Sequence, residues 1–117
     1  MKKNILVVDD NFDDLNTLRD ILVKNKYNVE IATNGSQAMD LVEINNFELI
    51  FIDIQMPTLS GYDLIRLIKE RVDGKVKIGY ITIIPKNNVH MKEIDGFVQK
   101  PFNNKSLLAE VKRLIGG

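Results

Sequence analysis

Short runs of apolar residues alternate along the chain with stretches in which apolar residues recur at helical spacing. Two of the runs, residues 5–8 and 49–52, contain no polar residue, which is typical of strands buried on both faces of a parallel sheet. Val29 and Ile31 instead alternate with polar neighbours. The pattern predicts five strands, at residues 5–8, around 29–31, 49–52, 77–83 and 96–99.

Helical spacing begins after each of the first three strands and again near the end of the chain. The first helix is predicted over residues 13–25, with Asp13 and Asp14 favouring its first turn. Ser36 is predicted to cap the second helix, and Ser60, with Asp63 three residues later, resembles a capping box for the third. The buried faces are expected at Ala38, Met39, Leu41 and Val42, at Leu64, Ile65, Leu67 and Ile68, and at Leu107, Leu108, Val111, Leu114 and Ile115 of a final helix capped by Asn103 or Asn104.

The region between residues 84 and 95 has the weakest pattern. Pro85 is expected to end the fourth strand, residues 86–88 form a predicted loop, and residues 89–94 suffice for one or two helical turns. A fourth helix is therefore predicted to be short or irregular. The alternation of strands and helices predicts an α/β fold, a doubly wound five-stranded parallel sheet with helices on both faces, in one domain over residues 1–117.

The composition supports a folded domain and excludes several function classes. Hydrophobic residues make up 44% and charged residues 27% of the chain, which argues against disorder and against a membrane protein. Lys plus Arg (16) balances Asp plus Glu (16), so direct nucleic-acid binding is not expected. The absence of cysteine excludes disulfides and cysteine-ligated metals. The apolar run after the first lysines is too short for a signal peptide, so a cytoplasmic protein is expected.

Polar residues occur where the predicted strands end. Asp9 and Asp10 follow the first strand, Asp53 follows the third, Thr82 ends the fourth and Lys100 follows the fifth. In an open parallel sheet the carboxyl ends of the strands line the binding crevice. Three carboxylates gathered there repel one another, and the usual relief is either a raised carboxyl pKa or a bound hard cation. Mg²⁺ is the expected ion, because it accepts one or two carboxylates and commonly accompanies phosphate.

Each of these residues also has a plainer interpretation. Asp53 precedes Pro57 and is compatible with a turn-forming aspartate, and Asp9 and Asp10 are compatible with strand-end caps. Lys100 on its own resembles a solvated surface lysine, and Thr82, within an apolar strand, is compatible with a hydroxyl that simply satisfies a backbone carbonyl. The only histidine, His90, lies in a polar loop and is expected to have a surface role.

Taken in order, these residues resemble the response-regulator receiver domains of two-component and phosphorelay signalling. The matching elements are Asp9-Asp10, Asp53-Ile54-Gln55-Met56-Pro57, Ser60-Gly61-Tyr62, Thr82 and Lys100-Pro101-Phe102. The resemblance spans essentially the whole chain. It implies the flavodoxin-like strand order 2-1-3-4-5.

The resemblance implies a role for each carboxylate. Asp53 would be the phosphoacceptor, which takes a phosphoryl group from a histidine kinase or a histidine phosphotransfer protein and forms an aspartyl phosphate. Asp10 and Asp53 would bind Mg²⁺ directly together with the backbone carbonyl of Gln55, and Asp9 would act through a coordinated water. The chain would be a phosphoprotein that catalyses only its own phosphorylation and dephosphorylation.

The resemblance also implies which residues respond to phosphorylation. Lys100 would pair with a phosphoryl oxygen, and a cis peptide bond before Pro101 would direct it into the crevice. Thr82 would hydrogen-bond another phosphoryl oxygen, and Phe97 would move inward as the switch aromatic. The active form would act on a downstream effector domain or protein, and the sequence leaves a homodimer open.

Two departures from the family pattern leave an alternative function open. Ile83 is bulky where the family usually has Ala or Gly, and the segment from Thr82 to Lys100 is several residues short. Both features are compatible with a degenerate receiver that works as a phosphorylation-independent protein-interaction module. An FMN-binding flavodoxin-like protein fits poorly, because its phosphate loop would need Ser, Thr or Gly at Asp9 and Asp10.

Overall fold

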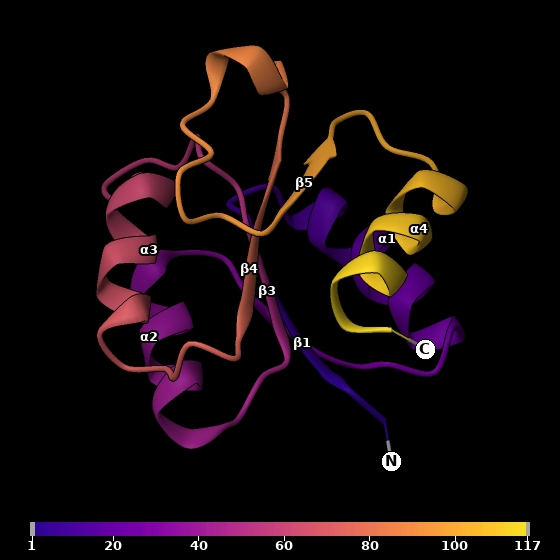
Figure 1. Cartoon of the computed structure of the whole chain (residues 1–117), viewed down its shortest axis with the longest axis horizontal. Coiled ribbons are helices and arrows are strands. Elements are labelled where there is room, and N and C mark those ends of the chain that lie inside the picture. Colours follow the sequence, from indigo (N-terminus) through magenta and orange to yellow (C-terminus); the bar gives the residue numbers. More distant parts are fainter. Residues whose placement is uncertain (1, 117) are drawn as a thin grey trace.

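The computed structural model of the chain describes residues 2–116. Its strands are β1 (Asn4–Val8), β2 (Asn28–Ala32), β3 (Leu49–Ile52), β4 (Lys77–Thr82) and β5 (Gly96–Gln99), and its α-helices are α1 (Phe12–Lys24), α2 (Gly35–Ile44), α3 (Gly61–Lys69) and α4 (Asn104–Ile115). The strands form one parallel sheet in the order β2-β1-β3-β4-β5. Helices α1 and α4 lie on one side of the sheet and α2 and α3 on the other (Figure 1). The predicted doubly wound sheet of order 2-1-3-4-5 is confirmed.

The central strands are buried because helices cover both of their faces. All of β3 and residues 5–8 of β1 are buried, as their purely apolar runs predict. Alternate residues of β1 face opposite sides: Ile5 and Val7 belong to the core under α1 and α4, and Leu6 and Val8 to the core under α2 and α3. The sheet therefore separates two apolar cores and carries its polar residues at the strand ends.

Side-chain caps determine where the helices begin. Each capping side chain accepts a backbone N–H of the first helical turn. The capping residues are Asn11 for α1, Asn34 for α2, Ser60 for α3 and Asn103 for α4. The prediction that Ser36 caps α2 is wrong. Asn34 caps it instead, accepting the Gln37 N–H at 2.9 Å, because asparagine caps as well as serine and the helix already begins at Gly35.

The predicted buried face of α3 is correct except at one residue. Gly61, Leu64, Ile65 and Ile68 are buried, at the i, i+3, i+4, i+7 spacing of a helix packed on a sheet. Leu67 is 41% exposed because it lies outside that spacing. The amphipathic pattern thus overestimated the width of the buried face by one position.

The chain between β4 and β5 contains only one helical turn, the 3₁₀ helix η1 (Lys86–Asn88). The prediction of a short or irregular fourth helix is confirmed, but the turn lies in the predicted loop and residues 89–94 are not helical. Val89, Met91 and Ile94 instead pack individually, partly buried, on the core under α2 and α3. Strand β4 ends at Thr82, one residue earlier than predicted, and leaves the next residue exposed.

Candidate functional site

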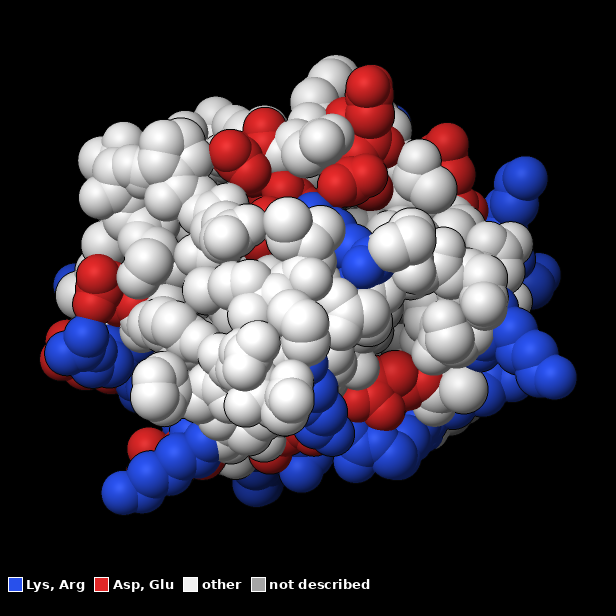
Figure 2. Space-filling model, turned by 90° about the horizontal axis from the view of Figure 1, so that it is seen from above, with Lys and Arg blue, Asp and Glu red and all other residues white. Residues whose placement is uncertain are grey.

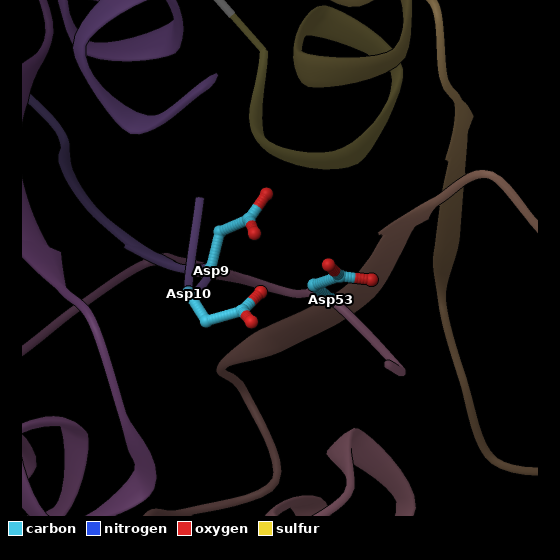
Figure 3. A group of neighbouring side chains, drawn as sticks. All are labelled: Asp9, Asp10 and Asp53. Atoms are coloured by element: carbon cyan, nitrogen blue, oxygen red, sulfur yellow. The ribbon is translucent and has the colours of Figure 1, made fainter. Parts of the chain in front are cut away.

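Three carboxylates meet where β1 and β3 end. Asp9 and Asp10 directly follow β1, and Asp53 directly follows β3, which is its neighbour in the sheet. One carboxylate oxygen of each lies within 4.8 Å of the other two, and Figure 3 shows the three side chains gathered at these strand ends. Asp9 and Asp53 are buried and Asp10 is exposed. The cluster is therefore open to solvent on the side of Asp10.

The ammonium group of Lys100 lies among these carboxylates. Its Nζ is 2.5 Å from Asp9 Oδ2, 3.0 Å from Asp14 Oδ2 and 3.4 Å from Asp53 Oδ2, and its side chain is 9% exposed. Lys100 follows the edge strand β5, so its side chain reaches past β4 to the ends of β3 and β1. Its backbone N–H donates to the Thr82 carbonyl at 2.8 Å, and the Lys100–Pro101 peptide bond is cis, the geometry that the resemblance implies.

Burial and charge act in opposite directions on these groups. Burial raises the pKa of Asp9, although the hydrogen bond from Lys100 partly offsets this effect. Burial alone would lower the pKa of Lys100. Its hydrogen bonds to Asp9 and Asp14 and the negative charges of Asp9 and Asp53 together outweigh burial, so the pKa is raised and the ammonium group stays charged. Four nearby carboxylates then face a single positive charge. This excess of carboxylate oxygens suits a hard divalent cation.

The two residues that the resemblance assigns to switching lie on β4 and β5, the strands that follow β3 in the sheet. Thr82 is fully buried at the end of β4, and its Oγ1 accepts the Ile84 N–H at 3.2 Å. Phe97 is partly buried in β5, opposite Tyr80 in register. Because side chains alternate along strands and paired residues share a face, Thr82 and Phe97 face the same side of the sheet. Gln55 lies just beyond the cluster and donates its backbone N–H to Asp53 Oδ1 at 3.2 Å.

Comparison with known sequences decides the family. The family model described as the response regulator receiver domain matches residues 5–112. The chain belongs to this family. The receiver is 30% identical to the probable transcriptional regulator ycf29 of Pyropia yezoensis over 98% of its own length and 54% of that protein, and 29% identical to the regulatory protein VanRB of Enterococcus faecalis over 98% and 53%. It thus spans about half the length of these curated relatives.

Solved structures resemble the receiver over nearly its whole length. A CheY-like receiver domain protein from Methanospirillum hungatei is 29% identical, with a TM-score of 0.88 over 97% of this chain and 93% of that one. Response regulator TrrA from Thermotoga maritima, in complex with Mg²⁺ and BeF, is 31% identical, with a TM-score of 0.85 over 96% and 98%. The receiver domain of a Pseudomonas aeruginosa sensor histidine kinase, with magnesium in its active-site cleft, is 25% identical, with a TM-score of 0.86 over 100% of both chains. Two homologous receivers thus contain Mg²⁺, one of them in its own active-site cleft.

One residue of the site escaped the sequence analysis. Asp14, the third residue of α1, pairs with Lys100, whereas the sequence suggested only a favourable interaction with the helix dipole. The signal that could have found it is position, because the first turn of a helix that follows β1 lies at the mouth of the crevice. Seen from above, the receiver has a group of acidic side chains next to a basic one, beside a broad uncharged surface (Figure 2).

Proposed function

We propose that this receiver is a signalling switch in which Asp53 accepts a phosphoryl group. The observation that carries the proposal is the environment of the Asp53 carboxylate. It is buried, its Oδ1 accepts the Gln55 N–H, and its Oδ2 lies 3.4 Å from the ammonium group of Lys100. Asp53 Oδ1 is thus fixed by a backbone hydrogen bond, and Lys100 lies close enough to pair with an incoming anion.

The reaction is a transfer from nitrogen to oxygen. A carboxylate oxygen of Asp53 forms a bond to phosphorus as the bond between phosphorus and the donor's histidine nitrogen breaks, and the electron pair of that bond stays on the imidazole. Lys100 moves from its carboxylate partners to a phosphoryl oxygen, so that the positive charge follows the transferred group.

Asp9, Asp10 and Asp53 fit a magnesium ion, because they offer three hard oxygen ligands within reach of one another. In the proposed site Asp10, Asp53 and the backbone carbonyl of Gln55 would hold the ion directly, and Asp9 would hold it through a water. The ion supplies positive charge that offsets the repulsion between the carboxylates and the arriving phosphoryl group.

In this proposal the receiver switches when the hydroxyl of Thr82 changes its hydrogen-bond partner. Its hydroxyl now accepts the Ile84 N–H, and in the proposed active form it turns to a phosphoryl oxygen while Phe97 moves inward on the same side of the sheet. Phosphorylation raises the population of that form because only there are the new contacts made.

The biological setting is part of the proposal. Residues 1–117 form one cytoplasmic receiver domain that takes its phosphoryl group from a histidine kinase or histidine phosphotransfer protein and signals to an effector. The names of the relatives, a probable transcriptional regulator and a regulatory protein, support the part of this proposal that concerns an effector. Within residues 2–116, no helix has both the length and the apolar character needed to cross a bilayer.

Labelling with acetyl phosphate and Mg²⁺ tests the proposal. The wild-type chain is expected to gain the mass of one phosphoryl group, and Asp53→Asn is expected to gain none, because an amide does not form the acyl phosphate. Asp40→Asn, a change of the same kind at an exposed position of α2, serves as control and should label like the wild type. Labelling of Asp53→Asn at another residue would overturn the assignment.

A second candidate function, the phosphorylation-independent interaction module, is favoured by one observation. Ile83 directly follows Thr82 at the rim of the site and is 61% exposed, where a bulky side chain hinders an approaching donor. An unlabelled wild-type chain in the same experiment, folded and able to bind Mg²⁺, would favour this candidate.

A further inference from the structure

Asp14 forms a contact that the proposed phosphotransfer does not explain. Its Oδ2 lies 3.0 Å from Lys100 Nζ, closer than the Oδ2 of Asp53 at 3.4 Å. The side chain of Asp14 is 36% exposed, whereas those of Asp9 and Lys100 are almost completely buried. Lys100 is therefore held from the solvent side by Asp14 and from the interior by Asp9.

The usual structural role of an acidic residue at this helix position is filled by Asp9 and not by Asp14. An acidic residue at the third position of a helix usually reaches back to the backbone N–H of the cap residue. Here that N–H, on Asn11, donates to Asp9 Oδ1 at 3.0 Å. Asp14 contributes only its own backbone N–H to the cap, donated to Asn11 Oδ1 at 3.0 Å. Its carboxylate is thus free to bind Lys100.

We propose that Asp14 is a positioning residue that competes with the phosphoryl group for Lys100. In the unphosphorylated receiver it holds the ammonium group at the mouth of the crevice, and Lys100 must give up this contact to pair with a phosphoryl oxygen. The inference rests on the proposed function, because it assigns a partner to the same lysine. It makes Asp14 a brake on phosphorylation.

Removing the charge of Asp14 should therefore have two opposite effects. Lys100 becomes easier to recruit and the anionic phosphoryl group meets less repulsion, so an anion binds more tightly. The crevice also becomes less negative, so a cation binds more weakly. A change that only disturbed the local fold would weaken both kinds of binding together.

Calorimetric titration separates these outcomes. The ligands are Mg²⁺ alone and then beryllofluoride at saturating Mg²⁺. For Asp14→Asn we expect the Kd of Mg²⁺ to rise and that of beryllofluoride to fall, each by about two- to fivefold, the range of a partly exposed ion pair. Asp14→Glu keeps the charge and should restore wild-type values.

Asp13→Asn is the matched control, because Asp13 lies in the same helical turn, carries the same charge and is exposed. It removes the same favourable charge from the helix start but is not a partner of Lys100, so its two constants should change less than those of Asp14→Asn. Constants for Asp14→Asn that equal the control's, or that move in the same direction, would overturn the role of Asp14. A wild-type chain that does not bind beryllofluoride would instead overturn the proposed function, and the role of Asp14 with it.

Discussion

Buried polar groups of this receiver have partners even far from the crevice. Among residues 2–116, each buried side-chain nitrogen or oxygen makes a hydrogen bond. Glu110 of α4 is an example, because it accepts a backbone hydrogen bond from the edge strand β5. Its Oε2 accepts the Phe97 N–H of β5 at 2.8 Å, and its Oε1 accepts Arg113 Nε at 2.7 Å. Because β5 is an edge strand, this carboxylate satisfies a backbone donor that has no neighbouring strand.

The Glu110 pair predicts a pH-dependent stability. The hydrogen bond from Arg113, aided by that from Phe97, holds the pKa of Glu110 below its ordinary value of 4.5, although burial opposes the shift. Since the folded-state pKa is depressed, the stabilisation is fully present above about pH 4.5 and is lost as the pH falls through the folded-state value.

Glu110→Gln is therefore expected to lower the free energy of unfolding at pH 7 by about 0.5–1 kcal/mol, because Arg113 is largely exposed and the pair is screened. Urea unfolding at pH 7 and below pH 4 measures the difference, which should shrink at the lower pH. Glu30→Gln, exposed on the opposite edge strand β2, should show no such trend. A difference that grows on acidification would contradict the assignment.

At the scale of elements, the start of α3 is packed directly on the backbone that carries Asp53. The Gly61 N–H donates to the Ile54 carbonyl at 2.9 Å. A Cβ on Gly61 would lie 2.5 Å from the Asp53 carbonyl oxygen and 2.8 Å from Ile54 Cα, and these backbone atoms cannot move aside as a flexible side chain can. The Ser60-Gly61-Tyr62 motif thus has a steric reason, which is to let the helix approach the loop that follows β3.

Gly61→Ala is expected to destabilise the receiver by about 1–3 kcal/mol, the usual cost of overpacking, although alanine is the better helix former. Denaturant unfolding measures the loss. Gly74→Ala is the matched control, because a Cβ there meets no atom within 4 Å and its free energy of unfolding should change by less than about 0.5 kcal/mol. If the two substitutions lowered the free energy of unfolding equally, a side chain at Gly61 would not clash with the backbone of Asp53 and Ile54.

At the scale of the whole molecule, the sheet was predictable, and so was the lack of a long helix after β4, but the position of the single turn there was not. The purely apolar runs of β1 and β3 predicted their burial, and residues at strand ends predicted where Asp9, Asp10 and Asp53 meet. The strand order came from the resemblance, because many orders share one hydrophobic pattern.

Tertiary contacts explain what the sequence pattern could not show. The Asp14–Lys100 pair joins residues far apart in sequence, and no local periodicity reveals it. The apolar side chains within residues 89–94 pack individually on the core under α2 and α3. Their spacing along the chain therefore does not have to be that of a helix.

The switching proposed for Asp53 would have to pass through this connection to reach β5. Without an α-helix, residues 84–95 are held by partly buried side chains and by a few hydrogen bonds. Lys69 Nζ donates to the Glu93 carbonyl at 2.7 Å, and the His90 N–H donates to Tyr62 Oη at 3.3 Å. In the proposed switch Thr82 would be the link, because its hydroxyl would release the Ile84 N–H at the start of this segment when it turned toward a phosphoryl oxygen.

Beryllofluoride with Mg²⁺ is therefore expected to shift backbone NMR resonances around Asp53 and also throughout residues 83–99, whereas Mg²⁺ alone should affect mainly the residues beside the carboxylates. Thr82→Val has the same shape but lacks the hydroxyl, so it should keep the shifts near Asp53 and lose most of those beyond residue 83. Shifts confined to the neighbourhood of Asp53 in the wild-type chain would mean that the site is not coupled to β5. The region between β4 and β5 would then serve as a fixed interaction surface, as in the phosphorylation-independent module.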